Sequence, residues 1–204
     1  MPSLRFALRK SLCAFALFGA SLSAVTCGGT GDSNDPNDPN SPEYDAITHL
    51  YARSTTELKL EIDYQVGAEP YTGMVFAMDT WNLFKVNADA LFKKQKTLTV
   101  PTMLSQMESL SDISGSNFSS QQILDIATKH RGTPDDGTSA SFYVLFLDGY
   151  FNDGKMVRKD VLGVSIGKTG VIAMFKPVIA STSNFANIRK FVEQSTLVHE
   201  FGHA

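Results

Sequence analysis

The chain has 204 residues, of which 43% are hydrophobic and 19% are charged, and its net charge at pH 7 is -3. This length and balance are those of a globular protein with one domain of ordinary size. A mildly acidic chain is poorly suited to nucleic acid, so we expect no nucleic-acid partner. Cys13 falls in an N-terminal apolar run, so removal of that run leaves only Cys27 and excludes an intrachain disulfide.

Residues 1–26 have the pattern of a signal peptide. Arg5, Arg9 and Lys10 form a positively charged start, and a largely apolar run over residues 12–25 follows. The run is too short to span a membrane comfortably, which disfavours a transmembrane anchor. The sequence therefore predicts an exported protein.

The signal peptide ends in Ala24-Val25-Thr26-Cys27. A cysteine directly after such a run resembles the lipobox of bacterial lipoproteins, where the cysteine is acylated after cleavage. Thr26 stands where that motif usually has a smaller residue, and Ala24 stands where it usually has Leu. Gly28, and not Asp, follows Cys27. In such lipoproteins the absence of Asp at this position favours sorting to the outer membrane. The resemblance implies lipidation at Cys27 and attachment to the bacterial cell envelope.

The segment over residues 27–43 is expected to be a lipid-anchored, disordered linker. It repeats an Asp-Pro-Asn triplet at residues 35–40 and contains nothing that could bury apolar surface. Its carboxylates show no EF-hand pattern, so a solvated tether is favoured over a calcium site. The folded domain is predicted over residues 44–204.

Strand and helix periodicities then alternate along this domain. Residues 58–64 alternate in polarity, which predicts a half-buried strand with Lys59, Glu61 and Asp63 on its solvent side. The near-continuous apolar run over residues 142–147 predicts a central strand buried on both faces. The other expected elements are helices over 80–95 and 119–130 and strands over 97–104, 161–166 and 171–175.

The strands over 161–166 and 171–175 are joined by Gly167-Lys168-Thr169-Gly170, which indicates a hairpin. The segment from Gly163 to Thr169 also resembles a phosphate-binding loop. It has one residue too few between its glycines, and no helical pattern follows it. The hairpin is therefore the favoured interpretation.

The last helix is expected to begin at a cap formed by Ser183 or Asn184. Helical periodicity places a polar sector on one side and a broad apolar sector, expected to pack on the sheet, on the other. The polar sector contains Arg189, Glu193, Thr196 and Glu200, and the apolar sector contains Phe191, Leu197, Val198 and Phe201.

The sequence closes with His199-Glu200-Phe201-Gly202-His203-Ala204, which is an H-E-x-x-H motif. Helix positions i and i+4 lie on one face, so His199 and His203 can bind one metal ion. Glu200 lies about 100° around the helix from His199. Two neutral nitrogen ligands with a carboxylate beside them are the arrangement of a zinc protease. The alternative, two unrelated surface histidines, is disfavoured by the apolar residues around them.

The run S-T-L-V-H-E-F-G-H-A at residues 195–204 resembles the active-site helix of the zincin metallopeptidases. In the metzincin branch the motif continues as H-E-x-x-H-x-x-G-x-x-H, and this sequence matches its first half. The resemblance implies an α/β (α+β) fold of the zincin N-terminal subdomain, incomplete at its C-terminus. That subdomain has a twisted mixed sheet whose antiparallel edge strand, here 161–166, binds a peptide substrate by strand addition. The family's third zinc ligand is absent from this chain.

The first hypothesis is an exported, lipid-anchored zinc metalloendopeptidase. His199 and His203 would bind Zn²⁺, and Glu200 would act as general base and then pass the proton to the leaving amine. The alternative is a non-catalytic surface lipoprotein, a truncated relative of such enzymes that binds a partner or ligand. The codons after Ala204 would separate the two, since a glycine and a further ligand would favour the peptidase and a stop codon the binding protein.

Overall fold

The structure is a computed structural model of the 204-residue chain, and it describes residues 46–92, 95–133 and 138–204. The predictions for the signal peptide, for Cys27 and for the linker over 27–43 lie outside the described residues. Among the helices of the described ranges, none combines the length and the apolar character that crossing a membrane requires.

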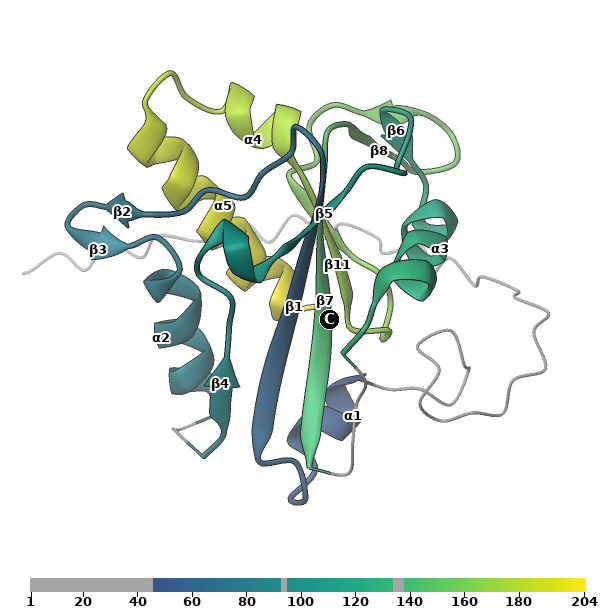
Figure 1. The fold of residues 1–204 in the computed structure, drawn as a ribbon. Helices are drawn as coiled ribbons and strands as arrows, with labels where there is room; N and C mark the ends of the chain where they lie inside the picture. Colours follow the sequence, from purple (N-terminus) through teal and green to yellow (C-terminus); the bar gives the residue numbers. More distant parts are fainter. Residues whose placement is uncertain (1–45, 93–94, 134–137) are drawn as a thin grey trace, which may run out of the picture. The chain divides into compact units, whose positions relative to one another are not determined.

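A mixed sheet of six strands forms the centre of the fold (Figure 1). Its strands are β1 (Glu57–Gln65), β4 (Thr97–Thr99), β5 (Glu108–Leu110), β7 (Ser139–Leu147), β10 (Gly163–Ser165) and β11 (Val171–Phe175). The order across the sheet is β10, β11, β7 and β1, and both β4 and β5 pair with the far side of β1. All pairs are parallel except β10 with β11, which is antiparallel. The expected mixed sheet with one antiparallel edge pair is thus confirmed.

β7 is the central strand, and all nine of its residues are buried. Successive side chains on a strand point to opposite faces, so β7 contributes to two separate cores. One core contains Phe142, Val144 and Phe146, and the other contains Tyr143, Leu145 and Leu147. The prediction of a strand buried on both faces over 142–147 is confirmed.

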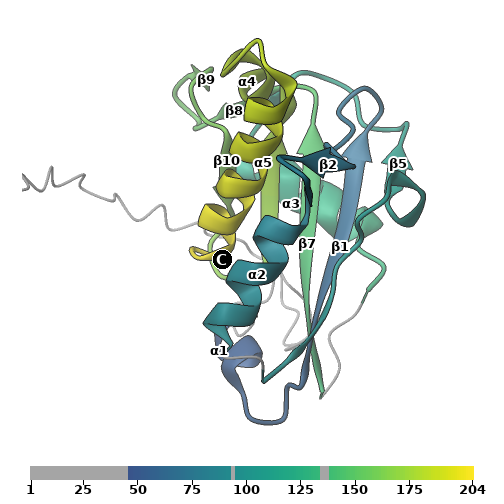
Figure 2. The same ribbon diagram turned by 90° about the vertical axis from the view of Figure 1, so that its left-hand side faces the viewer.

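Helices cover both faces of the sheet, as Figures 1 and 2 show. They are α1 (Ala46–Tyr51), α2 (Asn82–Leu91), α3 (Ser120–His130), α4 (Lys176–Ser181) and α5 (Ala186–Phe201), with one 3-10 turn at Leu104–Gln106. α2 and α5 pack side by side, and their Phe84 and Leu197 join the core that contains Phe142. On the opposite face, Ile123 of α3 joins the core that contains Tyr143.

Five short strands form two smaller sheets. They are β2 (Met74–Val75), β3 (Met78–Asp79), β6 (Asn117–Phe118), β8 (Tyr150–Asn152) and β9 (Val157–Arg158). β2 and β3 form an antiparallel hairpin, while β8 lies between β6 and β9. Segments of two or three residues are too short to show a periodicity, so the sequence did not predict them.

Several predicted boundaries were wrong. α2 begins at Asn82 and ends at Leu91, inside the predicted range 80–95, and Leu91 is exposed. β4 ends at Thr99 instead of continuing to residue 104, because Pro101 lacks the N–H that a strand ladder needs. α4, which directly follows β11, was not predicted.

α5 begins at Ala186 without a side-chain cap, so the expected cap at Ser183 or Asn184 is not formed. The Ser183 hydroxyl instead accepts a hydrogen bond from the N–H of Phe185 at 3.0 Å. Asp63 also differs from expectation, since it is 2% exposed instead of facing solvent. Its Oδ2 atom accepts a hydrogen bond from the Tyr143 hydroxyl at 2.7 Å.

Candidate active site

The C-terminal end of α5 is held in place by aromatic packing. Leu197 is fully buried, and Phe201 is 8% exposed. The Phe201 ring meets Phe84 and Phe142 edge-on, with centroid distances of 5.2 and 5.0 Å, and it approaches Phe92 at 6.5 Å. Aromatic pairs prefer edge-to-face arrangements of this kind, and each adds about 0.5–1.5 kcal/mol beyond the area that it buries. The helix turn that carries the H-E-x-x-H motif is therefore packed against α2 and the sheet.

His199 and His203 project from the exposed side of this turn. Their Nε2 atoms lie 3.1 Å apart, with ring centroids separated by 4.5 Å and ring planes at 85°. Two nitrogen ligands of a tetrahedral zinc ion, each about 2.1 Å from the metal, would be about 3.4 Å apart. The observed separation is close to this value, so the two imidazoles fit neighbouring positions of a zinc coordination sphere.

Glu200 is half-buried and lies on the side of α5 that faces the edge strand β10. Burial raises the pKa of its carboxyl, while the nearby His199 and His203 and a backbone hydrogen bond from Ser165 act in the opposite direction. A carboxylate whose pKa is raised toward neutrality is a stronger base. Glu200 is therefore placed, and electrostatically suited, to accept a proton next to the histidine pair.

Gly163 of β10 allows the edge strand to lie directly against α5. A Cβ atom at this position would be 3.0 Å from Glu200 Cγ, 3.0 Å from Thr196 Cγ2 and 3.1 Å from Met174 Sδ. These distances are shorter than ordinary carbon contacts of about 3.5–4.0 Å. A side chain at residue 163 would thus push the strand away from the helix or displace the Glu200 side chain.

A cleft of about 540 Å³ lies beside His199 and Glu200. One wall comes from the segment that enters β10, and the other comes from the exposed side of α5. The lining residues are Val161, Leu162, Gly163, Phe191, Val192, Ser195, Thr196, His199 and Glu200. The segment before β10 and the start of the α5 wall are apolar, whereas the polar side chains lie on α5 between Ser195 and Glu200. A ligand in this cleft would place apolar groups along α5 and a polar group near the histidines.

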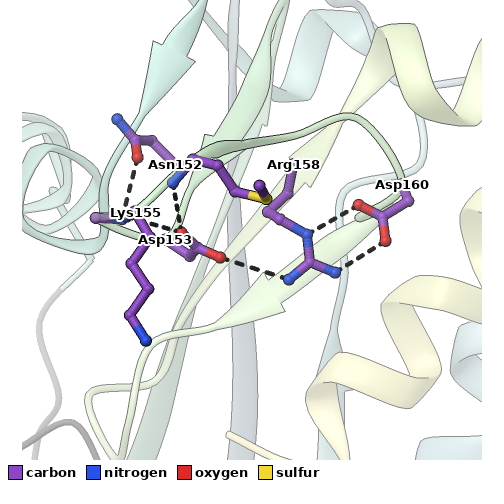
Figure 3. A network of polar contacts seen from close by, with 7 residues as sticks. Asn152, Asp153, Lys155, Arg158 and Asp160 are labelled. Atoms are coloured by element: carbon purple, nitrogen blue, oxygen red, sulfur yellow. Dashed lines mark hydrogen bonds and ion pairs between the residues drawn. The ribbon is translucent and has the colours of Figure 1, made fainter.

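The segment that leads to the cleft wall is braced by Arg158 of β9 (Figure 3). Its guanidinium donates to both carboxylate oxygens of Asp160, at 3.0 and 2.9 Å, and to Asp153 Oδ2 at 3.5 Å. Hydrogen bonding to Arg158 lowers the pKa of Asp160, and backbone hydrogen bonds, first that of Met156, lower the pKa of Asp153. All three charged side chains are solvent-accessible, so we assign this network a local bracing role.

The predicted orientation of α5 about its axis was wrong, since Thr196 of the expected polar sector is only 8% exposed. Phe191, expected to pack on the sheet, is 49% exposed, while Glu193, expected in the solvated sector, is 0% exposed. Glu193 is buried because Lys176 of α4 forms an ion pair with it. α5 is therefore rotated about its axis relative to the orientation that its apolar residues alone would favour.

The structure gives the other two histidines different partners. His49 Nε2 lies 2.9 Å from the carbonyl oxygen of Ser139, and His130 Nε2 lies 3.1 Å from Asp112 Oδ2. No cluster of three or more His, Cys, Asp or Glu side chains within the described residues is arranged to hold a metal. Val161 and Leu162 of the cleft wall belong to the segment 161–166 that the family resemblance implied as the substrate-binding edge strand, but the observed strand β10 begins only at Gly163.

Comparisons of the chain with protein-family models, with curated proteins and with solved structures gave no match.

Proposed function

We propose that the chain is a zinc-dependent metallopeptidase of the zincin type. One observation carries the proposal: the Nε2 atoms of His199 and His203 lie 3.1 Å apart, close to the spacing in tetrahedral zinc sites, beside the half-buried Glu200. The two histidines would be two of the zinc ligands. When bound, zinc would lower the pKa of a water molecule toward about 7 and polarise the substrate carbonyl.

The edge strand β10 (Gly163–Ser165) would bind the substrate. β10 pairs with β11 on one side, and no described strand pairs with its other side. An extended peptide can add to such an edge through backbone hydrogen bonds, with its side chains lodged in neighbouring pockets. The cleft between Val161, Leu162 and α5 opens beside this edge. A peptide lying along β10 would therefore bring its backbone close to Glu200.

Glu200 would move the proton. In this proposal its carboxylate accepts a proton from the attacking water and then donates it to the leaving amine. Burial, which raises the pKa of Glu200, favours the first of these steps, because a carboxylate with a raised pKa is a stronger base. The backbone hydrogen bond from Ser165 keeps the carboxylate directed toward the edge strand where the substrate would lie.

The test compares zinc content and peptide hydrolysis in the protein purified from its native host. Zinc is measured by atomic absorption, and hydrolysis is followed with a fluorescently labelled unfolded protein. His199→Ala and His203→Ala should each lose zinc, since each removes a ligand. Glu200→Gln should keep zinc and lose about 10²–10⁴ in rate, because an amide cannot accept the proton.

His130→Ala is the matched control, since it removes a histidine whose partner is Asp112 and should change neither quantity. A Glu200→Gln variant that hydrolyses as fast as its parent would refute the mechanism. Zinc binding that depends on His199 and His203 but is accompanied by no hydrolysis would instead favour the alternative, a non-catalytic surface lipoprotein that binds a partner or ligand.

We further propose that the protein is exported and lipid-anchored through Cys27 at the bacterial outer membrane. The charged start, the apolar run and Cys27 directly after it support this proposal. Expressed in its native host, the protein should incorporate labelled fatty acid and partition with membranes, and Cys27→Ala should abolish the labelling. A soluble parent protein that retains residues 1–26 would contradict it.

A further inference from the structure

A buried ion pair lies on α5, upstream of the H-E-x-x-H motif. Lys176, the first residue of α4, is 8% exposed, and Glu193, in the middle of α5, is 0% exposed. The Lys176 Nζ atom donates to Glu193 Oε2 at 2.5 Å. Burial raises the pKa of Glu193 and lowers that of Lys176, and the attraction between the two groups opposes both changes.

A third segment completes this contact. The backbone N–H of Tyr71 donates to Glu193 Oε1 at 2.7 Å, so both carboxylate oxygens of Glu193 accept directed hydrogen bonds. The Lys176 ammonium also lies 3.4 Å from the centroid of the Tyr71 ring and 5.8 Å from that of Phe146. Three separate segments therefore meet at one point: the loop after β1, the start of α4 and the middle of α5.

Glu193 lies almost in line with Glu200 along the helix. Seven residues at about 100° each return to within about 20° of the starting direction, and they advance the helix by about 10.5 Å. Thr196 lies between them on the same side and is 8% exposed. At residue 163 of β10, a Cβ would come within 3.0 Å of both Thr196 Cγ2 and Glu200 Cγ. The side of α5 that is anchored at Glu193 is thus the side that holds Glu200 against the edge strand.

Stability alone does not account for the pair. Replacing a buried ion pair by apolar residues of similar volume is often neutral or stabilising, because desolvation of the charges offsets their attraction. Apolar contacts, however, are not directional, and several rotations of a helix can bury similar areas. A carboxylate held by two donors from two different segments permits one rotation.

We propose that Lys176 and Glu193 are positioning residues that set the rotation of α5, and thereby direct Glu200 and the histidine pair at the edge of β10. The catalytic part of this inference rests on the proposed function, whereas the structural part does not. The Lys176–Glu193 pair holds α5 in the rotation that leaves Phe191 exposed and turns Glu200 toward Gly163.

The experiment uses the double variant Lys176→Met/Glu193→Leu in the full chain. Rotation is measured as the NMR cross-peak between the Gly163 Hα protons and the Thr196 methyl group, which are close in the structure. We expect a folded variant with an unfolding midpoint equal to or above that of the parent. Its cross-peak should be weakened or split, and its kcat should fall about 10- to 100-fold with little change in KM.

Lys129→Met is the matched control, because it removes a lysine from an exposed ion pair with Asp112 and should leave the cross-peak unchanged. A folded double variant that retains the parental cross-peak overturns the inference, since the pair would then be merely structural. If the double variant does not fold, Glu193→Asp decides. This variant keeps the charge but shortens the side chain, and an unchanged cross-peak in it overturns the inference as well. A parent protein with an intact cross-peak but no hydrolysis would refute the proposed function alone.

Discussion

Replacing Asp63 by Asn should remove a pH-dependent loss of stability that arises from burial of this carboxyl group. Asp63 is 2% exposed on β1, and its carboxylate accepts a hydrogen bond from the Tyr143 hydroxyl at 2.7 Å. Burial raises the pKa of Asp63 from 3.8 to about 6. The Tyr143 hydrogen bond opposes this shift, while the charges of Glu61 and Glu108 add to it.

The size and sign of the effect follow from this pKa. A shift of one pKa unit corresponds to about 1.4 kcal/mol, so a change from 3.8 to about 6 amounts to about 3 kcal/mol. The folded protein holds the Asp63 proton more tightly than the unfolded chain does. The free energy of unfolding contributed by this group therefore decreases as the pH rises from about 4 to about 6, and it stays constant above that range.

The assay is urea unfolding of the parent and of Asp63→Asn at several pH values between 4 and 7.5. The difference in unfolding free energy between the two proteins should change by about 2.4 kcal/mol across this range, with the variant gaining relative to the parent as the pH rises. Asp125→Asn, an exposed residue of α3, is the control and should show a constant difference. A difference for Asp63→Asn that does not vary with pH would refute the assignment of a raised pKa to this group.

Three further substitutions test close packing in the fold and at the site. Leu197→Ala should cost about 2–5 kcal/mol of unfolding free energy in urea titrations, because Leu197 is fully buried, and a loss below 1 kcal/mol would contradict that placement. Gly149→Ala should unfold or severely destabilise the protein in thermal scans, since its Cβ would be 2.5 Å from the backbone oxygen of Ser116. Gly163→Ala should lower the rate of peptide hydrolysis with zinc content retained, because its Cβ would meet Glu200 Cγ at 3.0 Å, and an unchanged rate would contradict the close approach of β10 to α5.

The features of the fold that the sequence predicted are those with strong local patterns. The unbroken apolar run of β7 and the alternation in β1 follow from burial on two faces and on one face, respectively. The β10–β11 hairpin follows from its glycine-bounded turn. Asp63 was misplaced because alternation assigns every second residue of β1 to solvent. It cannot indicate that β5 pairs beside Asp63 and that the Tyr143 hydroxyl from β7 meets its carboxylate.

The residues of the candidate site also differ in whether a local sequence pattern predicts them. His199 and His203 were predicted because a spacing of four residues needs only the geometry of one helix. The opposite wall of the cleft, Val161 and Leu162, lies in the segment 161–166 that only the family resemblance implied as a sheet edge, and no local pattern indicates how closely this segment approaches α5. That approach is decided by a single residue, Gly163, whose missing side chain is visible in the sequence only as a glycine within a predicted strand.

The rotation of α5 could not be predicted from its own residues. A rule that buries apolar side chains would place Phe191 on the sheet and leave Glu193 in solvent, and by the same rotation it would turn Glu200 outward. The structure has the opposite arrangement, because Lys176, which precedes the helix and belongs to another element, provides a buried partner for Glu193. No periodicity within α5 encodes that partner. The departure from simple amphipathic packing thus brings Glu200, the proposed general base, against the edge strand and leaves Phe191 to line the cleft.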